Sequence, residues 1–101
     1  MFPDYEALEE PLLRFIYENG GENHEVHSSE TYRPLADHFG LSAAERAKPR
    51  GDGRDEPLWN NMVQWARRKL KDRGYLARSA HGTWRLSDAG ILAAQKILAR
   101  K

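Results

Sequence analysis

The segment from Leu58 to Arg73 constrains the fold most, because at helical spacing its apolar residues fall on one side and its polar and charged residues on the other. At about 100° per residue, one arc is apolar and the opposite arc is polar and basic. The apolar arc holds Leu58, Trp59, Met62, Val63, Trp65, Ala66 and Leu70, and the polar arc holds Asn60, Asn61, Gln64, Arg67, Arg68 and Lys71. The pattern predicts a long helix with both tryptophans in or beside the core and its amides and cations facing solvent.

Shorter helices are predicted before this segment. Apolar residues recur at helical spacing from Asp4 to a stop at Asn19-Gly20-Gly21, and Pro11 inside this run predicts a bend or a fresh start of the helix. A second helix of about two turns is expected from Thr31 or Tyr32, since Pro34 fits only within a first turn.

Capping signals mark two further helix starts in this part of the chain. Ser42 and Glu45 have the spacing of a capping box, which predicts a small third helix. Residues 47–57 read as a loop, after which Asp55 or Glu56 is expected to cap the long helix, with Pro57 in its first turn.

Beyond the long helix, Gly74 predicts a stop and residues 75–87 predict a β-hairpin. Its turn is expected at residues 79–82, with Leu76, Trp84 and Leu86 on one face at period two. Ser87 is placed to cap a last helix. The order helix, helix, turn, long helix, hairpin, helix predicts a winged helix-turn-helix, mainly α with a small β-hairpin. The 101 residues suffice for one domain, residues 1–101 with an ordered core over about 4–99.

The charge distribution indicates a polyanionic partner. The net charge is only +1, but residues 1–50 hold five Lys/Arg against ten Asp/Glu, whereas residues 51–101 hold eleven against five. The basic half contains the long helix, which favours double-stranded DNA as the partner. The absence of cysteine and of a secretory signal or membrane-length apolar run favours a cytoplasmic location.

Within a winged helix, the long helix lies in the major groove and the hairpin touches the nearby backbone. Amides pair with adenine and arginine with guanine, while other cations neutralise phosphates. Base readout is therefore predicted for Asn60, Asn61, Gln64 and Arg67. Backbone contacts are predicted for Arg68, Lys71, Lys48, Arg50, Arg54, Arg78, His81 and Arg85.

Three stretches of the chain are considered together: "PLLRFIYENGGE", "PLADHFGLSAAERA" and "WNNMVQWARRKLKDRGYLARSAHGTWRLSDAG". In this order they resemble the N-terminal winged-helix domain of Mrr-type restriction endonucleases, and the resemblance runs from about Tyr5 to Leu98. The resemblance implies a DNA-recognition module that precedes a nuclease domain and directs it to modified, often methylated, DNA. It also implies a prokaryotic protein associated with the nucleoid. Met62 stands where the family often has a basic residue, so no contact is carried over to that position.

Other chemistry is weakly supported. The histidines of "HEVH" at residues 24–27 and the acids Asp52, Asp55 and Glu56 do not form a convincing metal set, and no cofactor or catalytic residue is predicted. The chain by itself is therefore expected not to be an enzyme, and a nuclease would be a further domain or a partner. The alternatives are a stand-alone transcriptional regulator acting as a homodimer, or a protein-docking module.

Overall fold

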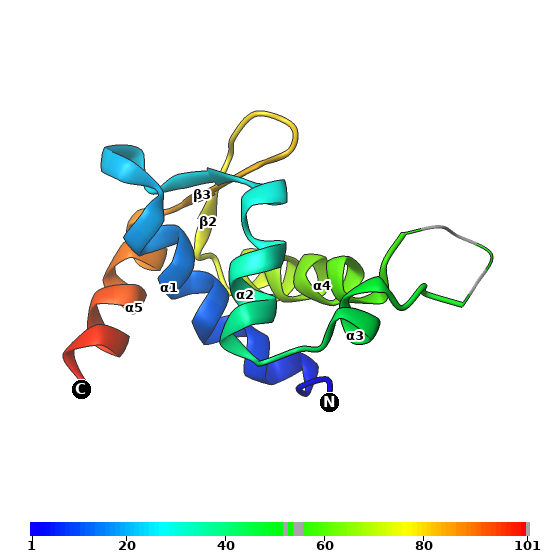
Figure 1. Ribbon diagram of the computed structural model, residues 1–101. Coiled ribbons are helices and arrows are strands. Elements are labelled where there is room, and N and C mark those ends of the chain that lie inside the picture. Colours follow the sequence, from blue (N-terminus) through cyan, green and yellow to red (C-terminus); the bar gives the residue numbers. More distant parts are fainter. Residues whose placement is uncertain (52, 54–55, 101) are drawn as a thin grey trace.

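The computed structural model describes residues 1–51, 53 and 56–100, and Figure 1 shows their arrangement. Within these residues, the α-helices are α1 (Glu9–Asn19), α2 (Tyr32–His38), α3 (Ala43–Ala47), α4 (Leu58–Asp72) and α5 (Asp88–Ala99). The strands are β1 (Glu25–His27), β2 (Leu76–Ala77) and β3 (Thr83–Leu86). Single turns of 3₁₀ helix lie at Tyr5–Leu8, Gly21–Asn23 and Ser28–Glu30.

The two prolines in the first helices occupy positions that a helix tolerates. A 3₁₀ turn ends at Leu8 and α1 begins at Glu9, so Pro11 lies in the first turn of α1, where a backbone N–H has no partner within the helix. Of the two alternatives predicted for Pro11, a bend in one helix or a new helix start, the structure therefore shows the new start. Pro34 likewise lies in the first turn of α2, which begins at Tyr32 as predicted.

The capping box of α3 is present in full. The Ser42 hydroxyl accepts a hydrogen bond from the Glu45 N–H at 3.1 Å, and the Glu45 carboxylate accepts one from the Ser42 N–H at 2.8 Å. The start of α4 differs from the prediction, since Pro57 is the N-cap residue and no side chain caps the helix. Glu56 instead pairs with Arg50 and Gln64, whereas Asp55 lies outside the described residues.

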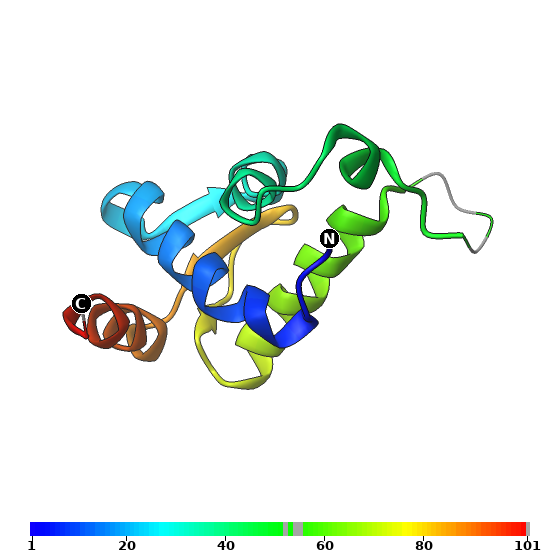
Figure 2. The same cartoon turned by 60° about the horizontal axis from the view of Figure 1, so that its bottom comes forward.

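The core lies where α1 packs against α4 and α5 (Figure 2). Leu8, Leu12, Val63 and Leu70 are almost completely buried there. Trp59 is also buried, and its indole N–H donates to the backbone carbonyl of Tyr32 at 2.8 Å, which fixes α4 to α2. The buried residues of the first 3₁₀ turn, the strands and the helices form one continuous cluster, so the described residues share a single core.

Trp65 is the exception among the tryptophans. The helical pattern places it on the apolar arc, but 43% of it is exposed. The expectation that both tryptophans of the long helix lie in or beside the core is therefore wrong for Trp65. The residue lies at the edge of that arc, beyond the part that the neighbouring elements cover.

The hairpin is part of a three-stranded antiparallel sheet in the order β1-β3-β2. Leu76 pairs with Leu86 as the period-two pattern predicts, and Val26 of β1 pairs with Trp84 on the other side of β3. Sequence reasoning missed β1, which is only three residues long. Ser87 caps α5, its hydroxyl accepting from the Gly90 N–H at 3.1 Å.

This arrangement of α1, α2 and α4 with the β2–β3 hairpin is a winged helix-turn-helix, with α4 in the position of the recognition helix and residues 78–82 at the tip of the wing. None of the helices described here has both the length and the apolar composition to cross a bilayer.

Candidate nucleic-acid interface

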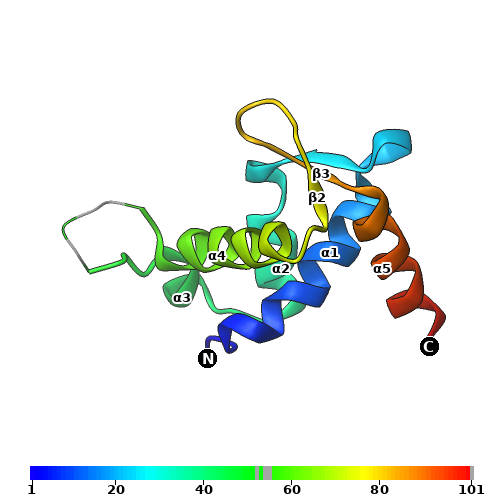
Figure 3. The same cartoon turned by 180° about the vertical axis from the view of Figure 1, so that it is seen from behind.

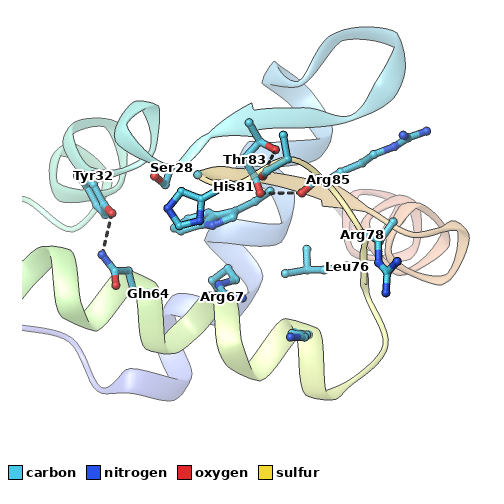
Figure 4. A pocket seen from close by; sticks show the side chains of 15 residues that line it. Ser28, Tyr32, Gln64, Arg67, Leu76, Arg78, His81, Thr83 and Arg85 are labelled. Carbon is cyan, nitrogen blue, oxygen red and sulfur yellow. Dashed lines mark hydrogen bonds between the residues drawn. The ribbon is translucent and has the colours of Figure 1, made fainter.

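An open cleft of about 640 Å³ lies between α4 and the wing. Figure 4 shows it with α4 as one wall and the wing as the other. The cations that line it are Arg67 and Lys71 of α4, and Arg78 and Arg85 of the wing. No carboxylate is found among the described residues that line it. A concave surface with charges of only one sign concentrates anions, because nothing in its walls cancels the field.

The wing is held in a defined shape by hydrogen bonds of its own turn. The Ser79 and Thr83 hydroxyls donate to backbone carbonyls at 2.7 Å each, and the Thr83 N–H donates to the Ala80 carbonyl at 3.0 Å. Gly82 has a φ of 83°, a conformation that glycine adopts without strain. The Gly82 carbonyl accepts from the Ser28 N–H at 2.8 Å, which ties the wing to the segment after β1.

The two arginines of the wing point in different directions. Arg78 and Arg85 are both exposed, and Figure 4 shows the guanidinium of Arg85 turned away from α4. His81 is exposed at the tip of the wing. The structure therefore brings Arg67, Lys71 and Arg78 to the cleft itself, while Arg85 lines it from β3, the central strand of the sheet.

Arg67 lies across the cleft floor against the wing. Its guanidinium carbon is 6.0 Å from the centroid of the Trp84 ring, a cation–π distance. Its Nε is buried and has no hydrogen-bond partner among the described residues. A buried donor without a partner is costly, and this nitrogen stays unsatisfied although Arg67 as a whole is only half-buried beside the cleft.

Gln64, on the polar arc of α4, is already hydrogen-bonded within the protein. Its side-chain N–H₂ donates to the Tyr32 hydroxyl at 3.1 Å and to the Glu56 carboxylate at 3.0 Å. The other Glu56 oxygen accepts from Arg50 at 3.0 Å. Tyr32 lies at the end of the cleft nearest α2, as Figure 4 shows. Sequence reasoning placed Gln64 on the correct face but missed Tyr32.

The remaining predicted residues of α4 differ in accessibility. Asn60 and Asn61 are half-buried in the first turn, and Lys71 is exposed in the last. Arg68 is exposed, and its guanidinium carbon lies 5.4 Å from the Trp65 ring centroid, on the flank away from the cleft. The polar arc predicted for α4 is therefore present, but its side chains do not all face the cleft.

The described cations of the loop, Lys48 and Arg50, lie beside the start of α4, and Figure 3 shows this loop at the end of α4 away from the wing. Lys48 is exposed, with its ammonium group 6.0 Å from the Phe2 ring centroid, and Arg50 forms an ion pair with Glu56. Arg54 lies outside the described residues. The structure therefore separates Lys48 and Arg50 from the wing residues along the length of α4.

The histidines of "HEVH" have structural roles. The His24 ring stacks on Tyr17 with centroids 4.8 Å apart, and the His27 Nδ1 accepts from the Ser29 N–H at 3.2 Å. In the described portion of the chain, no group of three or more His, Cys, Asp or Glu side chains is placed to hold a metal ion.

Comparison with known proteins places these features in a family context. The chain matches the family described as the Mrr N-terminal domain over residues 5–96. It is 31% identical over 91 residues to the type IV methyl-directed restriction enzyme EcoKMrr of Escherichia coli (strain K12), covering 88% of this chain. The aligned part spans 28% of that enzyme's length. No solved structure is significantly similar to the chain.

Proposed function

Because the chain belongs to the Mrr N-terminal domain family, a restriction-system family, we propose that it binds double-stranded DNA as the target-recognition module of such a system. The observation that carries this proposal is the cleft beside α4, lined by four Arg/Lys and, among the described residues, by no carboxylate. A duplex backbone is the polyanion whose shape suits a helix flanked by a wing.

In this proposal α4 enters the major groove and one phosphate strand runs through the cleft between α4 and the wing. Base edges are read by Asn60, Asn61, Gln64 and Arg67. Phosphates are contacted by Arg68, Lys71, Lys48, Arg50, Arg54, Arg78, His81 and Arg85. The buried Nε of Arg67 leaves the outer nitrogens of its guanidinium for guanine or a phosphate oxygen.

Recognition and cleavage are assigned to different parts of the system. The chain spans 28% of the length of EcoKMrr, which is named as a methyl-directed restriction enzyme. We assign no catalytic step to the residues of this chain; a nuclease domain or a partner nuclease would cut the DNA that this module selects. Methylated bases are the proposed marks.

The test is fluorescence anisotropy of labelled 20-base-pair duplexes titrated with the protein, using matched duplexes with and without 5-methylcytosine or N6-methyladenine. We expect saturable binding that is weakened by salt, with a preference for one modified duplex. Equal binding of all duplexes would remove the methyl-reading part of the proposal. Failure to bind any duplex at low salt would remove the DNA-binding part.

One observation favours a second candidate function, protein docking. Tyr5 is 48% exposed and Trp65 is 43% exposed, and both line a mainly apolar hollow of about 400 Å³ beside Glu6 and Lys69. Exposed aromatic surfaces of this kind occur at protein interfaces, including those of homodimers. Sedimentation analysis would detect self-association, and a DNA-binding homodimer would select a palindromic site.

A further inference from the structure

We propose that Tyr32 and Gln64 act as one reading unit, in which Tyr32 determines base specificity together with the recognition helix. The unit is fitted to adenine, with Gln64 accepting from the exocyclic amine and Tyr32 donating to the ring N7. This inference rests on the proposed DNA binding and assigns a role to α2 in addition to α4.

The orientation of the Gln64 amide is set by its neighbours. A carboxylate only accepts hydrogen bonds, so the atom of Gln64 that lies 3.0 Å from Glu56 is the N–H₂ group. The same group donates to the Tyr32 hydroxyl at 3.1 Å. Gln64 Oε1 is therefore turned away from these two partners, and the described residues offer it no hydrogen-bond donor.

The Tyr32 hydroxyl is complementary to this arrangement. Its oxygen accepts from Gln64, which leaves its own O–H as a donor, and within the described residues no acceptor is bonded to it. The free groups of the pair are thus one acceptor, Gln64 Oε1, and one donor, the Tyr32 O–H. Both residues line the cleft beside α4, and Figure 4 shows them facing each other at its end.

The surroundings hold the unit rigidly. Trp59 donates its indole N–H to the Tyr32 backbone carbonyl at 2.8 Å, so the main chain of Tyr32 is fixed to α4 as well as its hydroxyl. Arg50 bonds to the outer oxygen of Glu56 at 3.0 Å and balances the charge of that carboxylate. Little rearrangement is then needed before a base is bound, which favours affinity.

The chemistry selects adenine among the four bases. In the major groove adenine alone carries a donor, N6–H, beside an acceptor, N7, on the same base. A glutamine with both amide groups free would read this edge by itself, but the N–H₂ of Gln64 is occupied by Tyr32 and Glu56. Tyr32 supplies the missing donor. A methyl group replacing the outward N6–H would remove the donor that Gln64 requires, so the unit reads an unmethylated amine and a methyl mark is read elsewhere.

The experiment begins with selection of a preferred duplex from a randomised library by the wild-type protein. The selected duplex is then titrated with wild type, Tyr32→Phe and the control Tyr5→Phe, which removes a hydroxyl on the far side of α4. Loss of one hydrogen bond predicts that Tyr32→Phe weakens binding to the selected duplex by about 3- to 10-fold, with scrambled duplexes unaffected. Tyr5→Phe is expected to match wild type.

Substituted duplexes test the same unit without altering the protein. Replacing the selected adenine by 7-deazaadenine, which lacks N7, is expected to weaken wild type as much as Tyr32→Phe does and to have no further effect on that variant. N6-methyladenine at the same position is expected to weaken both proteins.

The outcomes separate this inference from the proposed function. Wild type that binds no duplex, or selects no motif, would overturn the proposed DNA readout together with this unit. A selected motif that lacks adenine, or equal behaviour of Tyr32→Phe and Tyr5→Phe, would overturn the role of Tyr32 alone and leave DNA binding in place.

Discussion

The sharpest test of the proposed interface compares two lysines of one helix. Lys71 lines the cleft beside the wing, whereas Lys69 lies on another flank of α4, beside Trp65. Both side chains are exposed, and they lie two residues apart on the same helix. Replacing either lysine by alanine therefore removes one positive charge from nearly the same height along α4. If the cleft binds phosphates, only Lys71→Ala removes a phosphate contact.

The expected magnitude follows from the cations of the cleft. Each neutralised phosphate contributes about −0.9 to the slope of log K against log salt. Lys71, Arg78 and Arg85 line the cleft and are the cations assigned there to phosphates, and these three contacts alone predict a slope of about −2.7, or roughly a 40-fold loss of affinity between 50 and 200 mM salt. With Lys71 replaced, their contribution falls to about −1.8, or roughly 12-fold. Contacts elsewhere add equally to both proteins, so the difference of about 0.9 is the quantity to measure.

The assay is anisotropy of one duplex at five or more salt concentrations for wild type, Lys71→Ala and Lys69→Ala. Lys69→Ala is expected to retain the wild-type slope. Equal slopes for all three proteins would refute the assignment of phosphates to the cleft, and a reduced slope for Lys69→Ala alone would place the backbone on the Trp65 flank instead.

Two further predictions concern the scaffold. In Gly90→Ala, the helix propensity of alanine favours folding by about 1 kcal/mol, but the new Cβ collides with the Tyr75 backbone, and overpacking of this kind costs about 1–3 kcal/mol. We expect net destabilisation by up to about 2 kcal/mol in urea unfolding, and a more stable variant would contradict this close approach. For Glu45, a hydrogen bond from the N-terminal ammonium group, followed by the backbone bond of the capping box, lowers the pKa from 4.5 to about 2. Because the pKa of Glu45 is lower in the folded protein than in the unfolded chain, the ionised carboxylate stabilises the fold above about pH 4.5, and this stabilisation is lost as the pH falls towards 2. Glu45→Gln removes the titrating group, so its stability should fall less steeply than that of wild type between pH 4.5 and 2. Thermal melts across this pH range measure the difference.

Much of the fold could be predicted because its signals are local. The capping box joins Ser42 to Glu45, Ser87 caps a helix whose N–H groups lie within three residues, and the apolar arc of α4 repeats along one segment. These interactions depend on neighbours in the sequence, and the structure confirms them. The hairpin is equally local, since β2 and β3 are joined by a short turn.

The parts that could not be predicted depend on distant residues. β1 has one buried apolar residue, Val26, and exists through its pairing with β3 nearly sixty residues later, for which a three-residue segment gives no periodic signal. The exposure of Trp65 depends on how much of the α4 surface the neighbouring elements cover. A helical wheel gives only the angular position of a residue and carries no information about that coverage. The hydrogen-bond partners of Gln64 come from α2 and from the end of the loop. The helical wheel therefore predicts which side of α4 the Gln64 amide lies on, but not the hydrogen bonds that it makes there.

The two halves of the α4 polar arc suit different parts of a duplex. From Asn60 to Arg67 the helix rises by about 10 Å, which is less than the ≈12 Å width of the major groove. Lys71 lies about 16 Å from Asn60 along the axis, where base edges give way to backbone. The charges follow the same division: the Gln64 amide, with the paired Glu56 carboxylate behind it, belongs to the first half, and the cationic cleft lies beside the second. Bases opposite Gln64 and phosphates opposite Lys71 therefore satisfy both the dimensions of the groove and the charge of the protein, whereas the reverse orientation would set the Glu56 carboxylate against phosphate.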